Sequence, residues 1–170
     1  MANIRIMGCD PGLGRTGWGV IEVAGMKLTH VANGAIATRP ADGLGVRLVA
    51  LHRALSEIIS AHQPDAVAVE QAFVHKDPLA AMKLSHARAV ALLAAAEAEI
   101  EIAEYTPNHI KKSVVGVGHA SKEQVQAMVK RLLPSARCEE ADAADALAVA
   151  IAHAHLSRTA ARINAALAAL

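Results

Sequence analysis

Apolar and polar residues fall into blocks at the start of the chain, and the blocks predict a β-hairpin. An apolar stretch over residues 4–9 ends in one carboxylate, Asp10, and a second apolar stretch begins at Trp18. Between and just beyond these stretches stand Pro11, Gly12, Gly14, Gly17 and Gly19. Pro and Gly end an extended run and let the backbone turn sharply, so we expect a tight bend with the acid beside it.

Asp10 needs a partner in this position because an isolated buried carboxylate is very costly. Its own Gly-rich turn is one candidate, since Asp often hydrogen-bonds nearby backbone groups in turns. The others are a cation, a different hydrogen-bonding loop and a metal that also binds phosphate. The hairpin by itself does not distinguish between a structural and a functional role for this acid.

Beyond the hairpin, short apolar runs alternate with stretches of helical spacing. Residues 27–37 continue the antiparallel meander as a third strand, residues 66–70 form a fully buried strand that ends in Glu70, and residues 101–105 form a fifth strand. Helical spacing and capping residues predict helices at 46–61, 77–98, a short stretch from 106, 121–133 and 140–155, with a Gly-punctuated loop over 114–120. This order predicts an α/β fold with a mixed five-stranded sheet flanked by helices.

The length of 170 residues suits one compact domain, which we place at residues 1–156. The tail that follows, residues 157–170, is expected to be either helical or loosely ordered. The predicted helix over residues 77–98 is rich in alanine from Ala87 on, and small side chains let another helix approach closely. That face is our candidate dimer surface; packing on the protein's own sheet is the alternative, and both can hold.

Composition narrows the class of protein only slightly. The chain is 54% hydrophobic but 2% aromatic, so its core must be built from Ala, Val, Leu and Ile, and a net charge of +1 does not by itself indicate a nucleic-acid-binding protein. Cys9 and Cys138 form neither a disulfide framework nor a paired-cysteine metal motif. The sequence shows no basic leader and no uninterrupted apolar run of membrane-spanning length. We therefore expect a soluble, cytoplasmic protein that does not enter a membrane.

Four acids stand where elements begin or end. Asp142 and Asp145 are three residues apart near the start of the last predicted helix, so both project from one face, although a helix N-terminus favours negative charge for purely structural reasons. With Asp10 and Glu70 they form an oxygen-only set of the kind that binds Mg²⁺ or Mn²⁺. Two such ions about 3.5–4 Å apart can activate water and stabilise the leaving oxygen of a phosphodiester. They would also raise the net charge from +1 to about +5, which is compatible with binding DNA.

Four ordered motifs resemble the RuvC family of bacterial Holliday-junction resolvases, which are ribonuclease H-like nucleases. The motifs are G-C-D-P-G at 8–12 with T-G-W-G-V at 16–20, V-E-Q-A-F at 69–73, V-V-G-V-G at 114–118 and A-D-A-A-D-A-L-A-V-A-I at 141–151. The resemblance runs nearly from end to end. It implies a ribonuclease H-like fold and a crossover junction endodeoxyribonuclease, a Mg²⁺-dependent hydrolase of recombination and DNA repair. Such an enzyme resolves four-way junctions by paired symmetric nicks.

The resemblance also implies roles for the acids and for partners. Asp10, Glu70, Asp142 and Asp145 would be catalytic and metal-binding, with two Mg²⁺ ions per active site that Mn²⁺ can replace. The protein would act as a homodimer, with one site for each of two symmetry-related strands, and would contact a branch-migration motor complex.

The remaining implied contacts are to DNA. In this family an aromatic residue just past the acid of the fourth strand contacts junction bases, and here that residue is Phe73, the only Phe in the chain. Base stacking on an aromatic ring is physically sound. The family's basic contacts map onto Lys111 and Lys122. Three further candidates rest only on nearness in sequence, and a solvated surface charge is the simpler interpretation for them: Lys83, Arg88 and Lys112.

Three other classes of protein are alternatives for this sequence. An ATP-binding protein of the sugar-kinase or actin type begins with a similar Asp-Gly hairpin, but this chain is too short for two lobes and lacks the second phosphate loop. A non-catalytic DNA-binding module would leave four converging acids unexplained, because carboxylates repel phosphate. A ribonuclease H-like enzyme acting on RNA is the nearest alternative, and Phe73 with residues 111–122 favours branched DNA only through the resemblance.

Overall fold

The protein is described from a computed structural model that covers residues 3–71, 77–137 and 140–167. Five strands form one sheet: β1 (Ile4–Asp10), β2 (Arg15–Ala24), β3 (Lys27–Ala37), β4 (Ala66–Glu70) and β5 (Glu101–Tyr105). Five helices accompany it: α1 (Leu44–His62), α2 (Pro78–Glu97), α3 (Pro107–Val115), α4 (Lys122–Leu132) and α5 (Ala141–Leu167). The predicted mixed five-stranded sheet flanked by helices is confirmed.

The strands are arranged in the order β3-β2-β1-β4-β5. The first three form the predicted antiparallel meander, whereas β4 runs parallel to β1 and β5 runs parallel to β4. In the register of the central pair, Cys9 lies opposite Val69. The next residue on each strand is an acid, so Asp10 and Glu70 end neighbouring parallel strands at the same edge of the sheet.

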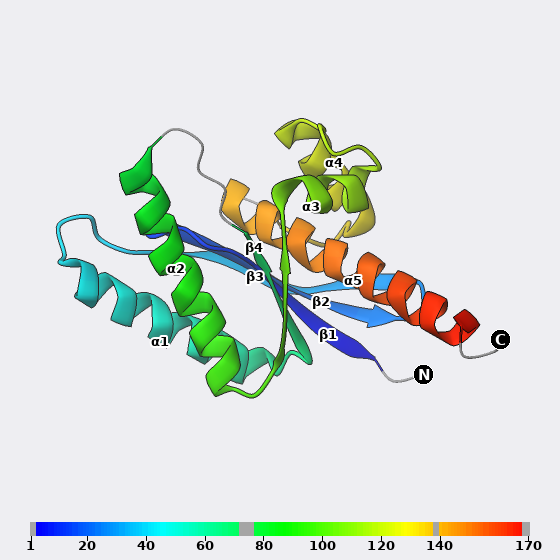
Figure 1. The fold of residues 1–170 in the computed structure, drawn as a ribbon, viewed down its shortest axis with the longest axis horizontal. Coiled ribbons are helices and arrows are strands. Elements are labelled where there is room, and N and C mark those ends of the chain that lie inside the picture. The colour runs from blue at the N-terminus through cyan, green and yellow to red at the C-terminus, as the bar shows by residue number, and fades with distance from the viewer. Residues whose placement is uncertain (1–2, 72–76, 138–139, 168–170) are drawn as a thin grey trace.

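Helices cover both faces of the sheet (Figure 1). On one face α1 and α2 enclose a core that includes Met7, Val20, Leu51 and Leu55. On the other face α5 lies against the sheet, with α3 and α4 outside it, around a second core centred on Leu147 and its neighbours in α5. The apolar pattern of β4 serves both layers: Ala68 belongs to the α5 core, while Val67 and Val69 belong to the α1 and α2 core.

Capping residues begin helices α2 and α4 as predicted. The Asp77 carboxylate accepts a hydrogen bond from the backbone N–H of Leu79, with Pro78 at the first helical position. Ser121 and Gln124 form a complete capping box, in which each side chain accepts from the other residue's backbone N–H. These local bonds satisfy donors that would otherwise have no partner at the start of a helix.

The boundaries of β2 and α3 differ from the predictions. Strand β2 begins at Arg15, three residues before the predicted apolar stretch, so Gly17 lies inside the strand and not in the turn. Helix α3 extends through Val115, and the loop begins only at Gly116, whose φ of 94° is in the left-handed region that favours glycine.

Helix α5 is the longest element, with 27 residues. It continues without a break through residue 157, where the tail was predicted to begin, and ends at Leu167. By length and composition alone, α2 is the one helix in the described parts of the chain that could cross a membrane, a property that core helices of soluble proteins share. The alanine face of α2 packs on the protein itself, since Ala87, Ala91 and Ala95 are buried. The other side of this helix exposes Leu79, Met82 and Leu93.

The glycines of β1 and β2 allow α5 to lie directly on the sheet. A Cβ placed on Gly17 would come within 2.0 Å of the backbone oxygen of Asp142, and one on Gly8 would come equally close to the backbone oxygen of Ala146. Gly17 is also the residue that pairs with Asp10 across the hairpin. The strand position that aligns Asp10 is therefore the same one against which the first turn of α5 rests.

We expect Gly17→Ala to destabilise the protein, because the added methyl group meets backbone and cannot be relieved by a side-chain rotation. Overpacking of this kind costs about 1–3 kcal/mol, which a thermal or denaturant unfolding curve resolves easily. Gly14→Ala is the matched control, since nothing lies within 4 Å of a Cβ at that position. Equal unfolding midpoints for the two variants would contradict a close approach of α5 at Gly17.

Candidate active site

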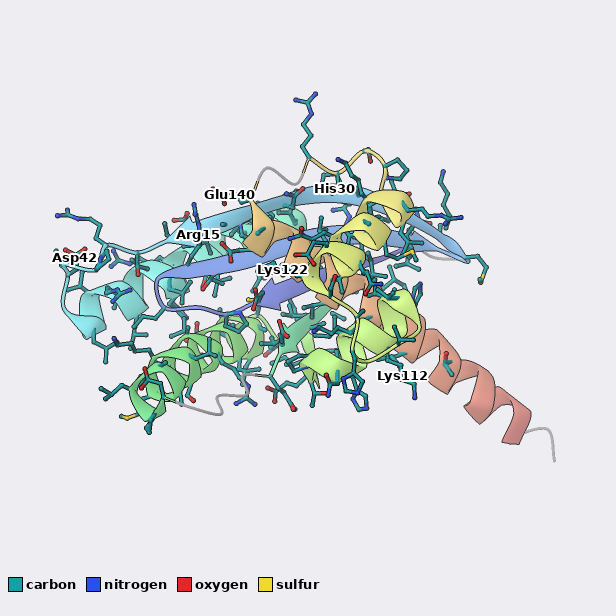
Figure 2. All side chains as sticks on the ribbon, turned by 90° about the horizontal axis from the view of Figure 1, so that it is seen from above. Arg15, His30, Asp42, Lys112, Lys122 and Glu140 are labelled. Atoms are coloured by element: carbon teal, nitrogen blue, oxygen red, sulfur yellow. The ribbon has the colours of Figure 1, made fainter. Side chains whose placement is uncertain are left out.

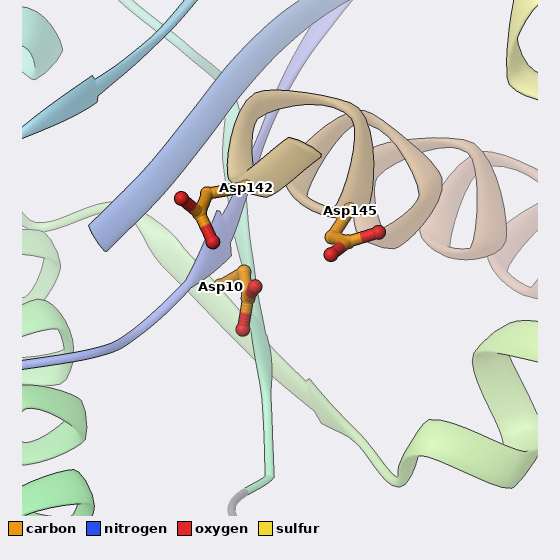
Figure 3. Close-up of side chains that lie close together, drawn as sticks. All are labelled: Asp10, Asp142 and Asp145. Atoms are coloured by element: carbon orange, nitrogen blue, oxygen red, sulfur yellow. The ribbon is translucent and has the colours of Figure 1, made fainter. Parts of the chain in front are cut away.

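Four acids reach the predicted site from three elements. Asp10 ends β1 and Glu70 ends β4, while Asp142 and Asp145 occupy the start of α5, which crosses the glycine-bearing face of the sheet. One carboxylate oxygen from each of Asp10, Asp142 and Asp145 lies within 4.8 Å of the other two (Figure 3). Residues more than 130 positions apart in the sequence thus form one acidic cluster.

Glu70 adjoins this cluster through Asp10. Together with burial, the charges of Asp10 and Asp145 both act on the Glu70 carboxyl group and raise its pKa, so Glu70 lies beside the cluster. Glu70 and Asp145 also line a cavity of about 290 Å³, whose other lining residues are Pro107, Ile110, Lys111, Lys122, Val125 and Ala148. The cavity opens the acids to a ligand along the side formed by α3 and α4.

The acids strongly disfavour one another's ionisation. Burial, followed by the charge of Asp10, raises the pKa of Glu70 from 4.5 to about 8. Burial, followed by the charge of Asp145, raises the pKa of Asp10 from 3.8 to about 6. Burial and the neighbouring carboxylates thus both disfavour the ionised acids, and a bound cation would favour them.

The donor set fits a hard divalent cation. All the candidate ligand atoms are carboxylate oxygens. Hard cations such as Mg²⁺, Mn²⁺ and Ca²⁺ prefer oxygen ligands over softer ones. Cys9 lies next to Asp10 but is buried in the opposite core, and burial raises the pKa of its thiol, so it stays protonated and does not compete as a ligand. The cluster is therefore able to hold metal.

Two basic side chains border the acids from opposite directions. The Lys122 ammonium, at the first turn of α4, lies 2.6 Å from a carboxylate oxygen of Asp145. Arg15, at the start of β2, places its Nε 3.6 Å from a carboxylate oxygen of Asp142. Lys122 is one of the predicted DNA contacts, and Lys111, the other one drawn from the resemblance, lines the same cavity. The structure brings both lysines to the four acids.

The weaker candidates lie elsewhere. Arg88 on α2 donates from its Nε to the carboxylate of Glu104 on β5 at 2.6 Å and is engaged in an ion pair. Lys83 and Lys112 are exposed and do not line the acidic cavity. Phe73 lies outside the described residues. A DNA-binding role for these four remains a prediction.

Arg15 and Glu140 are neighbours of the site that our sequence interpretation missed. The Arg15 Nη2 donates to the Glu140 carboxylate at 2.7 Å, and the same guanidinium faces Asp142 (Figure 2). The sequence contained one signal for Arg15: a hairpin that places Asp10 beside its bend must also place a residue near position 15 at the same end of the sheet. That signal gives the location of Arg15 but not its partners, which are Asp142 in the first turn of α5 and Glu140 just before that helix.

The fold and the acidic cluster together define a ribonuclease H-like protein, and comparisons with known proteins specify it further. A family model described as crossover junction endodeoxyribonuclease RuvC matches residues 6–153. Two curated relatives with that description are the protein of Parvibaculum lavamentivorans, 53% identical over 97% of this chain and 94% of the relative, and that of Paracoccus denitrificans, 57% identical over 89% and 92%. The chain belongs to the RuvC family.

Solved structures agree with this assignment. The structure described as T. thermophilus RuvC in complex with Holliday junction substrate matches with a TM-score of 0.87 and 33% identity, over 92% of this chain and 96% of that one. The yeast mitochondrial Holliday junction resolvase Ydc2 matches with a TM-score of 0.63 and 11% identity, over 88% and 78%, which shows a shared fold alone.

The raised pKa values predict a pH dependence of stability in the metal-free protein. Between about pH 4.5 and 8 the folded state retains a proton on Glu70 that the unfolded chain has lost, so the free energy of unfolding should fall as pH rises through this window. Each pKa unit of difference corresponds to about 1.4 kcal/mol. Glu70→Gln should reduce this slope and stabilise the metal-free protein at pH 8.

Denaturant unfolding in EDTA at several pH values measures the effect. Glu57→Gln, on the exposed side of α1, is the matched control and should follow the native protein. A Glu70→Gln variant with an unchanged slope would show that Glu70 is not held against Asp10 in solution.

Proposed function

We propose that the protein is a Mg²⁺-dependent, structure-selective DNA endonuclease that resolves four-way (Holliday) junctions by paired symmetric nicks, in homologous recombination and DNA repair. The observation that carries the proposal is the convergence of Asp10, Glu70, Asp142 and Asp145 at one sheet edge of a RuvC-family chain. The matched T. thermophilus structure, described as a complex with Holliday junction substrate, supports a four-way junction as the ligand.

The four acids would hold two Mg²⁺ ions, for which Mn²⁺ can substitute. Bound there, the ions would supply an activated water and stabilise the leaving oxygen of the phosphodiester, leaving 5′-phosphate and 3′-hydroxyl ends. The protein's own contribution is positional: β1 and β4 present Asp10 and Glu70, and α5 presents Asp142 and Asp145 from above. Because each acid projects from a rigid strand or helix, the ligand atoms are held in place before substrate arrives.

The DNA would approach along the cavity side of the acids. Lys111 and Lys122 line that side and would contact phosphates next to the cleaved bond. Phe73 follows Glu70 by three residues, so its stacking on a junction base would occur close to the acids. Carboxylates alone would repel the DNA, so bound metal and the lysines would each favour its binding at this edge.

A homodimer would give the two sites that paired nicks require. A two-fold axis relates identical surfaces of two copies, and the strands of a four-way junction are related by similar symmetry. The exposed apolar residues of α2, Leu79, Met82 and Leu93, favour this helix as part of the interface. A cytoplasmic location and contact with a branch-migration motor complex complete the proposal and rest on the family resemblance.

A cleavage assay with three substrates tests the proposal. A four-way DNA junction, a linear duplex and an RNA–DNA hybrid would each be incubated with the purified protein in Mg²⁺ and in EDTA. We expect paired, symmetric, Mg²⁺-dependent nicks in the junction alone. Cleavage confined to the hybrid would move the substrate to RNA, and tight junction binding without cleavage in Mg²⁺ or Mn²⁺ would indicate a binding module.

Asp10→Asn should abolish cleavage while leaving junction binding intact or tighter, because the change removes a metal ligand and also a negative charge that faces DNA. Cleavage and a gel-shift titration in the same buffer separate the two effects. Glu57→Gln, which removes one exposed carboxylate far from the site, should cleave normally. Nicking by Asp10→Asn at the native rate would refute the role of Asp10.

Lys122→Ala should weaken junction binding and reduce the slope of log affinity against log salt by about one, as expected for one lost phosphate contact. The titration is made in Ca²⁺, which neutralises Asp145 and leaves the lysine available. Lys27→Ala, at the start of β3, is a surface control of equal charge change. An unchanged slope for Lys122→Ala would make this lysine only a partner of Asp145.

A further inference from the structure

Arg15 lies at the rim of the acidic cluster, between the carboxylates of Glu140 and Asp142. Its side chain is 50% exposed, its Nη2 donates to Glu140 at 2.7 Å, and its Nε lies 3.6 Å from Asp142 (Figure 2). Asp142 belongs to the group of oxygens that can hold a metal, whereas Glu140 does not. One arginine therefore links a candidate metal ligand to an acid outside the ligand set.

Metal binding must change the surroundings of this arginine. In the metal-free site the charge of Arg15 is shared between Asp142 and Glu140, so little of it is available to an incoming anion. A divalent cation on Asp142 would neutralise that carboxylate and weaken its attraction for the guanidinium. Glu140, the residue just before α5, would remain, so Arg15 would keep one anchor and stay at the rim.

A guanidinium in that position is suited to phosphate. Arginine carries five N–H donors in a rigid fork, and its contacts here with Glu140 and Asp142 use only Nη2 and Nε. Phosphate oxygens form short, charge-assisted hydrogen bonds with such a fork. Arg15 follows the hairpin bend that begins at Asp10, so a strand bound at the acids would pass within reach of it.

We propose that Arg15 is a phosphate contact of the bound DNA strand that becomes available when divalent metal occupies the acidic cluster, so that metal binding and DNA binding reinforce each other. This inference rests on the proposed function. It assigns Arg15 a role that Lys122 does not fully share, because within the described part of the chain Lys122 forms an ion pair with Asp145 alone.

The test measures binding of a four-way DNA junction in Ca²⁺ and in EDTA, each over a range of salt concentrations, with the junction checked for integrity on a gel. Ca²⁺ serves as a hard, oxygen-binding ion. The variants are Arg15→Gln, Arg15→Lys and the matched control Arg53→Gln on the exposed side of α1. Thermal melting of each variant confirms folding.

We expect the native protein to bind more tightly in Ca²⁺ than in EDTA. Arg15→Gln should bind the junction several-fold more weakly than the native protein in Ca²⁺. Its slope of log affinity against log salt should be reduced by about one in Ca²⁺ and unchanged in EDTA. Arg15→Lys should keep the slope but bind a few-fold more weakly in Ca²⁺, because a point charge replaces the fork. Arg53→Gln should match the native protein in both conditions.

Other outcomes overturn the inference. An equal loss for Arg15→Gln in Ca²⁺ and EDTA would show a contact independent of metal, and no loss in either would show no contact. A native protein that binds the junction without any gain from Ca²⁺ would refute the coupling alone, whereas one that fails to bind the junction would refute the proposed function as well. If Arg15→Gln does not fold, the Arg15→Lys result decides.

Discussion

The closeness of α5 to the sheet is the constraint on which the rest of this structure depends. Two acids come from strand ends and two from a helix, so their convergence requires helix backbone to touch strand backbone. Gly8 and Gly17 provide that contact by carrying no side chain on the face that α5 covers. The alanines of α5 complete it from the other side, since Ala146 and Ala150 meet the sheet at the Gly8 position.

Bringing the acids together lowers the stability of the folded, metal-free protein. Burial and mutual repulsion raise the pKa of Asp10 and of Glu70, so at neutral pH the folded metal-free chain holds a proton on Glu70 that an unfolded chain would have released. Lys122 and Arg15 offset part of the repulsion from the helix acids. The same imbalance that weakens the metal-free fold provides the driving force for binding cations, as is common where function requires like charges to converge.

Most of the fold could be predicted from the order of apolar runs, caps and breakers. The strands over 27–37, 66–70 and 101–105 follow directly from such runs, and the capping box at Ser121 marks the start of α4. The four acids were recognisable from their places at element ends and from the family motifs. Gly17 was misassigned to a turn, because local sequence rules consider only the flexibility of glycine. They do not reveal that Gly17 packs against Asp142, which lies 125 residues later in the chain. Arg15 was missed for the same reason, since its partners lie at the start of α5 and in the residue before it.

The length of α5 has a practical consequence for studying this protein. The acids occupy its first turns, and the helix then continues for 22 residues from Asp145 to Leu167, about 33 Å at the rise of an α-helix. Its far end projects past the sheet, away from the acids (Figure 1). A fluorophore or surface tether attached there would lie at the opposite end of the helix from the acids. Single-molecule records of junction binding could then be made without disturbing the chemistry.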